Sequence, residues 1–303
     1  MKRILITGAS GFIGRHVVAS LADQGYEIHA VDLRRGPSAA NVIWHETNLL
    51  DTKQVSDLFR TILPTHLLHF AWYAEHGKFW SSPLNLDWVA ASIGLFKSFA
   101  EAGGRRAVFA GSCAEYDWAG SEPLVEDKTP CEPGSLYGGC KNATRQVVQS
   151  YASQAGVSVA WGRIFFLYGP DENPNRLIPS ILRPMLEGKP GYCRSGDHVR
   201  DLLHVYDVAF AFVALLQSEV KGPVNIGSGD RITLGEVSRR VARIVGREDL
   251  LTVDRQPPTP ENPAVILADV NRLRREVGWK PRYDLTSGLE QVVASMGHPP
   301  TLK

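Results

Sequence analysis

Short apolar runs alternate with amphipathic stretches through the first two-thirds of the chain. The apolar runs predict strands at 3–7, 27–32, 42–44, 66–71, 106–111, 157–165 and 223–226. Between them, an apolar face that recurs with a helical period predicts helices at Gly14–Gln24, Thr52–Leu63, Pro83–Ala102 and Leu136–Ala155. Strands and helices alternating at this spacing favour a parallel sheet covered on both faces. The pattern therefore predicts an α/β fold built on a doubly wound parallel sheet.

The sequence pattern changes near residue 170. From there the chain is broken into shorter elements by Pro170, Pro174, Pro179, Pro184 and Pro190. Further helical patterns at Val205–Gln217 and 233–246 enclose a strand that ends in Asn225-Ile226-Gly227. We expect residues 170–303 to form mainly a smaller C-terminal α/β lobe, with segments near 200–228 returning to the sheet.

Composition excludes several classes of function. Hydrophobic residues at 44% and charged residues at 21% are typical of an ordinary globular protein. The net charge is +1 and the arginine pairs are scattered, so no nucleic-acid partner is expected. No apolar run approaches the roughly 20 residues of a membrane span, so no membrane partner is expected either. The four cysteines lack metal-ligand spacing, which predicts no metal site and reduced thiols in a cytoplasmic protein.

A glycine-rich segment, Thr7–Gly14, follows the first strand and opens the first helix. The first glycine permits a tight turn, the second lets the backbone approach a pyrophosphate, and the third lets helix and strand pack closely. The exposed N–H groups at the start of the helix favour phosphate. We therefore assign residues 1–169 to an NAD(P)-binding domain of the Rossmann type. The cofactor-binding residues predicted in this loop are Gly8, Ser10, Gly11, Phe12, Ile13 and Gly14.

Two nearby residues bear on which dinucleotide binds. Asp32 ends the second strand, where a carboxylate can accept both adenosine-ribose hydroxyls and repel a 2′-phosphate. Arg34 follows closely, and a guanidinium there could instead hold that phosphate. An alternative is that Arg34 is a solvated loop residue. The cofactor is thus NAD or NADP, with Asp32 favouring NAD.

A tyrosine and a lysine, Tyr137 and Lys141, stand four residues apart and so share one face of a helix. A free phenol has a pKa near 10, and a nearby ammonium and the positive nicotinamide ring favour the phenolate. Ser112 ends a predicted strand, from which its hydroxyl points into the crevice where ligands bind such sheets. We predict that Ser112, Tyr137 and Lys141 are catalytic.

Taken together, these motifs resemble the extended short-chain dehydrogenase/reductase family, which includes sugar-nucleotide epimerases, dehydratases and reductases. Further similar segments are 163–170, 199–207, 225–229 and 277–281, so the resemblance covers nearly the whole chain. It implies that Arg200 meets the nucleotide pyrophosphate, with an ion pair to Asp201 or Asp207 as the alternative. It also implies a homodimer. The remaining cofactor contacts that we assign are Asn48, Leu49, Ala71 and Phe165.

The loop 72–80 and residues 115–118 are rich in aromatic and polar side chains and are expected to line a sugar pocket. From them we assign Trp80 and Glu115 to substrate binding, and His76 is a possible additional acid. Packing between the lobes is the alternative role for these aromatic residues.

One departure from the family pattern concerns the reaction. Sugar-nucleotide dehydratases of the family carry an Asp-Glu pair directly after the position of Ser112, whereas this chain has Cys113 and Ala114, which argues against dehydration. The segment 111–118 looks most like nucleotide-deoxysugar reductases. The favoured function is therefore NAD(P)H-dependent reduction of a nucleoside-diphosphate 4-keto-6-deoxy sugar. An NAD-dependent nucleotide-sugar epimerase is the alternative, and a cofactor-binding sensor without chemistry is a third possibility.

Overall fold

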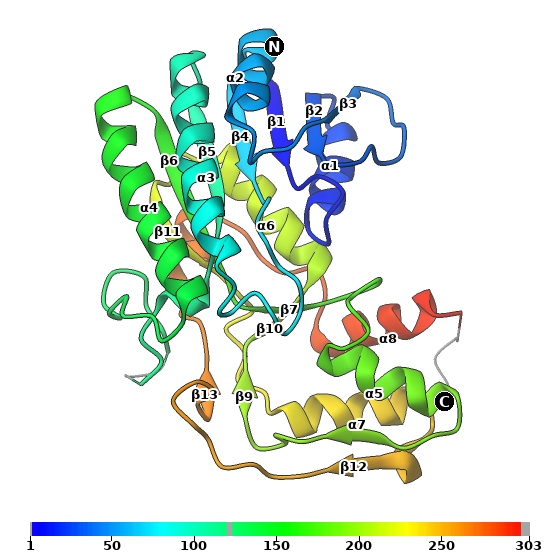
Figure 1. Cartoon of the computed structure of the whole chain (residues 1–303). Coiled ribbons are helices and arrows are strands. Elements are labelled where there is room, and N and C mark those ends of the chain that lie inside the picture. Colours follow the sequence, from blue (N-terminus) through cyan, green and yellow to red (C-terminus); the bar gives the residue numbers. More distant parts are fainter. Residues whose placement is uncertain (1, 120–122, 298–303) are drawn as a thin grey trace.

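A seven-stranded parallel sheet forms the centre of the protein (Figure 1). The computed structural model describes residues 2–119 and 123–297. Along the sheet the order is β3-β2-β1-β4-β5-β6-β11, and every neighbouring pair is parallel. The strands are β1 (Arg3–Thr7), β2 (Glu27–Asp32), β3 (Val42–Glu46), β4 (His66–His69), β5 (Arg106–Ser112), β6 (Ser158–Ile164) and β11 (Gly222–Ile226). The predicted doubly wound α/β fold is confirmed.

Helices cover both faces of this sheet. The helices α1 (Gly14–Ala22) and α6 (Val205–Gln217) pack in the hydrophobic layer on one face. The opposite face is covered by α2 (Thr52–Ile62), α3 (Leu84–Glu101) and α4 (Leu136–Ala155). Local capping fixes where α2 begins, because Asp51 accepts hydrogen bonds from the N–H groups of Lys53 and Gln54.

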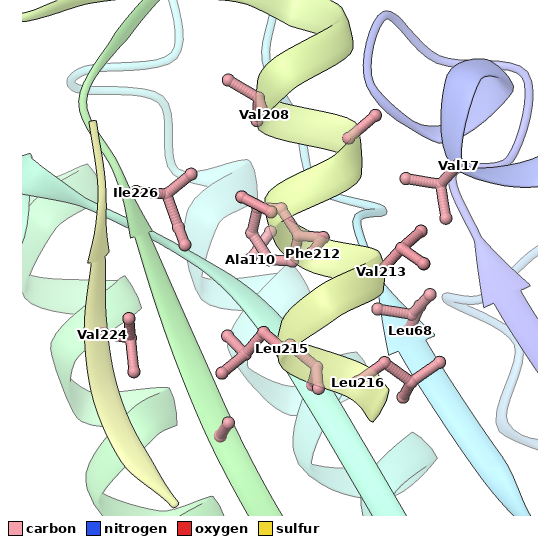
Figure 2. Packing of buried hydrophobic residues seen from close by; sticks show 14 of the residues in the cluster. Val17, Leu68, Ala110, Val208, Phe212, Val213, Leu215, Leu216, Val224 and Ile226 are labelled. Carbon is pink, nitrogen blue, oxygen red and sulfur yellow. The ribbon is translucent and has the colours of Figure 1, made fainter. Parts of the chain in front are cut away.

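The layer beneath α6 shows why this helix returns to the sheet after residue 200. Figure 2 shows the side chains of α6 directed toward Val17 of α1 and toward β4, β5 and β11. Phe212 and Leu215 are fully buried there. Full burial of such a side chain contributes roughly 1.5–3 kcal/mol, so α6 is held firmly on the sheet. The strand after α6 also lies in the sheet, since β11 pairs with β6.

A smaller lobe carries most of the residues after 170 (Figure 1, lower part). Its helices enclose a separate hydrophobic cluster that includes Ile181, Val237 and Leu289. Short strand pairs connect it to the sheet. The remaining elements of the chain are β7 (Phe166–Tyr168), α5 (Leu177–Leu186), β8 (Gly191–Cys193), β9 (Val199–Arg200), β10 (Leu202–His204), α7 (Leu234–Ile244), β12 (Leu251–Val253), β13 (Val265–Ile266) and α8 (Leu285–Ser295), with short helices at Glu248–Leu250, Arg272–Glu276 and, directly after β5, Cys113–Glu115.

Some predicted ends of helices and strands differ from the observed ones, for example where a strand is followed by a loop that lines the cavity. The strand predicted at 66–71 ends at His69, because Phe70 and Ala71 continue into the loop that lines the cavity. None of the helices in the described part of the chain is long and apolar enough to cross a membrane. Within residues 2–119 and 123–297 no cluster of His, Cys, Asp or Glu could hold a metal ion.

Candidate active site

A cavity of about 820 Å³ lies at the carboxyl ends of the strands, with the smaller lobe along its far side. Its walls come from the glycine loop, the end of β2, the loops after β3, β4 and β5, the start of α4, and residues 164–176. Ligands of open α/β sheets bind at this edge, and the volume is within the ordinary range of ligand sites. The position and size suit a large, extended ligand.

The glycine loop leaves little room for a side chain at its three glycine positions. Gly8 has φ +63°, and a Cβ there would lie 2.8 Å from the Ala71 nitrogen. A Cβ on Gly14 would lie 2.1 Å from the Gly8 oxygen, and one on Gly11 would lie 3.1 Å from the same atom. Gly8, Gly11 and Gly14 therefore place bare backbone against the cavity, as a dinucleotide pyrophosphate requires.

Asp32 is the charged group at the end of β2 that faces this loop. Its Oδ2 accepts hydrogen bonds from Ser10 N (3.0 Å) and Ser10 Oγ (2.8 Å), and its Oδ1 accepts one from Leu33 N (2.8 Å). Arg34 is exposed and does not line the cavity, while Arg35 forms an ion pair with Glu46 at 2.8 Å. The geometry therefore favours the ribose over the 2′-phosphate alternative.

Replacing Asp32 with alanine is expected to raise the affinity for NADPH relative to NADH. Removing the carboxylate removes its repulsion of a 2′-phosphate, and about 1.4 kcal/mol of relief corresponds to about tenfold. Fluorescence titration with NADH and NADPH measures the ratio. Arg34→Ala is the control and should leave it unchanged. An unchanged ratio in Asp32→Ala would contradict the ribose assignment, and a loss confined to NADPH in Arg34→Ala would indicate a phosphate contact.

The three predicted catalytic residues line the cavity together. Ser112 ends β5, and the interaction of its hydroxyl with the Tyr137 phenol favours a lower pKa for that phenol. Tyr137 is in the first turn of α4, a helix that Ser135 caps by accepting a hydrogen bond from Gly138 N. Lys141, one turn later, is buried, and its Nζ donates to the Ala110 oxygen at 2.9 Å. The arrangement places the Tyr137 hydroxyl, which can donate a proton, close to the hydroxyl of Ser112.

The protonation of this group differs from the simple expectation that the ammonium lowers the pKa of the phenol. Burial raises the pKa of Tyr137 well above its ordinary value, and the Ser112 hydrogen bond opposes this only in part. Burial lowers the pKa of Lys141 to about 7, although the charge of Glu115 opposes the shift. The Lys141 Nζ lies 3.8 Å from the Trp72 ring centroid and 6.0 Å from that of Tyr137, and it donates to a backbone oxygen.

Aromatic side chains form the wall around Tyr137. The ring centroids of Phe79 and Trp80 lie 4.9 Å and 5.8 Å from that of Tyr137, both edge to face. Trp72 lies edge to face at 6.4 Å, and its Nε1 donates to Asn85 Oδ1 at 2.8 Å. Trp80 is 38% exposed at the cavity rim, where a sugar ring could stack on it.

Glu115 does not line the cavity, contrary to its assignment to substrate binding. It is fully buried, and its Oε1 accepts hydrogen bonds from Ser112 N and Trp161 Nε1, both at 2.8 Å. Its Oε2 accepts from Arg163 Nε at 2.9 Å. With three donors bound and no exposed surface, Glu115 holds the backbone of Ser112 from behind and offers nothing to a ligand.

Arg200 is also absent from the cavity wall, contrary to its expected contact with the pyrophosphate. It is 4% exposed, donates to the Val199 oxygen at 2.7 Å and to Asn262 Oδ1, and lies 5.5 Å from the Phe166 ring. The alternative ion pairs are not formed either. Asp201 accepts from backbone N–H groups of Ser228, Gly229 and Ala268, and Asp207 from those of Arg282 and Tyr283.

The other residues assigned from the sequence are brought together. All line the cavity except Arg34, Glu115 and Arg200. Asn48, Leu49, Ala71 and Phe165 line it with the glycine loop. Sequence reasoning missed the segment 171–176, of which Glu172 and Arg176 line the opposite wall. The signal was present, since these polar residues directly follow the strand that leads out to the second lobe.

Comparison with known proteins places the chain among sugar-nucleotide enzymes. The model of the "NAD dependent epimerase/dehydratase family" matches residues 4–227. A UDP-glucose 4-epimerase of Neisseria meningitidis serogroup B is 26% identical over 332 residues, which cover 96% of each chain. A UDP-glucuronic acid decarboxylase of Xenopus tropicalis is 26% identical and covers 96% of this chain and 71% of its own length.

A solved structure extends the similarity to three dimensions. It is the UDP-glucose 4-epimerase of Thermus thermophilus in complex with NAD, which is 27% identical. The superposition has a TM-score of 0.85 and covers 97% of this chain and 99% of the other. The resemblance therefore extends over both lobes.

Proposed function

This chain belongs to the NAD dependent epimerase/dehydratase family, and from that premise we propose that it is an NAD-dependent UDP-hexose 4-epimerase. The observation that carries the proposal is the cavity in which Ser112, Tyr137 and Lys141 meet the glycine loop. The names of its relatives support the substrate class, because several of the epimerases among them are UDP-glucose 4-epimerases. The same relatives support the epimerase alternative over reduction of a 4-keto-6-deoxy sugar.

The residues that would hold the cofactor fit NAD. Bare backbone at Gly8 and Gly11 accommodates the pyrophosphate, Asp32 suits the ribose hydroxyls, and Asn48 and Leu49 line the adjoining wall. Bound NAD would supply reversible hydride transfer and a positive ring charge that favours the Tyr137 phenolate.

The catalytic residues of the chain divide the remaining work. The Tyr137 Oη removes the proton of a sugar hydroxyl and later returns it, and the Ser112 hydroxyl holds the same oxygen in place. Lys141 is buried beside them, and in its protonated form it would add positive charge that favours the phenolate. Trp80 and Phe79 form an apolar surface on which the sugar ring can turn so that either face meets the cofactor.

The residues beside Ser112 support a reaction without dehydration. Cys113 and Ala114 are 6% and 3% exposed, and neither carries a carboxyl group. Burial raises the pKa of the Cys113 thiol to about 12, so it is not an acid–base group at neutral pH. Elimination of water by an acid pair at these two positions is therefore disfavoured.

Incubation of the NAD-loaded protein with UDP-glucose tests the proposal. We expect UDP-galactose to form, which NMR of the sugar signals would detect. The absorbance of reduced cofactor should show no net change. Stoichiometric oxidation of NADH with a nucleotide 4-keto-6-deoxy sugar, without epimer interconversion, would contradict the epimerase and restore the reductase. Binding of NAD without turnover of either substrate would favour a sensor.

Two features of organisation belong to the proposal. We place the division between an NAD-binding domain at 1–169 and a mainly substrate-binding lobe at 170–303, supported by the separate hydrophobic cluster of the second lobe.

We also propose a homodimer formed through α3 and α4. Its support is the exposed apolar side chains of Leu84 and Leu86 on α3 and Val147 on α4, which are 42%, 57% and 45% exposed.

A further inference from the structure

Two buried polar atoms in the cavity wall have no hydrogen-bond partner within the described residues. They are His76 Nδ1 and Glu172 Oε2, and both residues line the cavity. His76 belongs to the loop after β4, and Glu172 to the segment after β7. A buried polar atom without a partner destabilises a protein, so such atoms in a ligand cavity mark a place where a ligand completes the hydrogen bonding.

The charges around these atoms define what they can bind. Burial raises the pKa of Glu172 to about 8, although the charge of Arg176 opposes the shift. Burial and Arg176 lower the pKa of His76, so the imidazole is neutral at pH 7. Asp171, the neighbouring acid, lies 3.4 Å from Arg15 in an exposed ion pair. At neutral pH the wall therefore presents a mostly protonated carboxyl group and a neutral imidazole.

We propose that His76 and Glu172 form a specificity subsite that binds a hydroxyl group of the hexose; this rests on the proposed function. A hydroxyl both donates and accepts, so it can satisfy either protonation state of Glu172 and either tautomer of His76. A ligand carboxylate only accepts, so it can bind Glu172 only while that group is protonated. A sugar hydroxyl satisfies both atoms in every protonation state, and a uronate held by Arg176 of the same wall is the alternative that the binding experiment below excludes.

The subsite predicts a difference between UDP-glucose and UDP. Isothermal titration of the NAD-loaded protein should show that UDP-glucose binds more tightly than UDP. Glu172→Ala and His76→Ala should each weaken UDP-glucose binding by about 10- to 100-fold, as expected for the loss of hydrogen bonds to buried groups, and leave UDP and NAD affinities unchanged. The matched control is Glu187→Ala, because Glu187 is exposed in the same lobe and pairs only with Lys189 among the described residues.

Deoxy analogues of UDP-glucose identify the hydroxyl and exclude a general disturbance of the cavity. One analogue, lacking the recognised hydroxyl, should bind the wild type weakly, and Glu172→Ala should bind that analogue and UDP-glucose equally. Undiminished UDP-glucose binding in both variants would overturn the subsite while leaving the epimerase intact. The subsite would also be overturned if UDP-glucuronic acid bound more tightly than UDP-glucose and this preference depended on Glu172 and His76. If UDP-glucose binds no more tightly than UDP, the subsite fails, whereas the epimerase fails only if no UDP-galactose forms.

Discussion

Replacing Tyr137 with phenylalanine is expected to slow epimerisation about 10²- to 10⁴-fold while leaving NAD affinity nearly unchanged. The change removes only the phenol hydroxyl, the group that interacts with Ser112. The ring would keep its edge-to-face contacts with Phe79 and Trp80, whose centroids lie 4.9 Å and 5.8 Å away. The cavity should therefore retain its shape and lose only the group that moves the proton.

Initial rates with UDP-glucose and titration with NAD measure the two effects separately. Tyr73→Phe is the matched control, because Tyr73 is in the loop after β4 and its hydroxyl donates to Glu75 at 2.9 Å. That variant should keep wild-type turnover. If Tyr137→Phe also kept it, the proton would have to move through another group and the assignment of the catalytic residues would be wrong.

The glycine loop and the catalytic helix were predictable because their chemistry is local. The residues from Thr7 to Gly14 join a strand to a helix in one tight turn, and Tyr137 and Lys141 are spaced by one helical turn. No long-range information is needed to bring such residues to the same edge of a parallel sheet. Cavity-lining positions followed from strand ends for the same reason.

The errors concern residues whose surroundings are set by distant parts of the chain. The guanidinium of Arg200 bonds Asn262, which is 62 residues later. Glu115 looked like a pocket residue because it follows Ser112 closely, but Arg163 and Trp161 of β6 enclose its carboxylate. Glu172 and Arg176 were missed for another reason, because they follow β7 directly and this local signal was not used.

The buried carboxylate of Glu115 leads to a large expected effect on stability. Glu115 and Arg163 are both fully buried, with Glu115 Oε2 2.9 Å from Arg163 Nε. Replacing Glu115 with leucine would leave the guanidinium without a counter-charge and Ser112 N and Trp161 Nε1 without their acceptor. Removing one partner of a buried pair typically costs about 3–5 kcal/mol. We expect a loss of that size in the free energy of unfolding.

Urea denaturation followed by far-ultraviolet circular dichroism measures this loss. The control is Glu187→Leu, since the Glu187–Lys189 pair is exposed, at 2.7 Å, and such pairs contribute about 0–1 kcal/mol. Replacing Arg163 with methionine in the Glu115→Leu background should recover part of the loss, because it removes the unpaired charge. A Glu115→Leu variant no less stable than Glu187→Leu would show that the pair does not hold β5 and β6 together. In that case Ser112 would have to be positioned by the backbone of β5 alone.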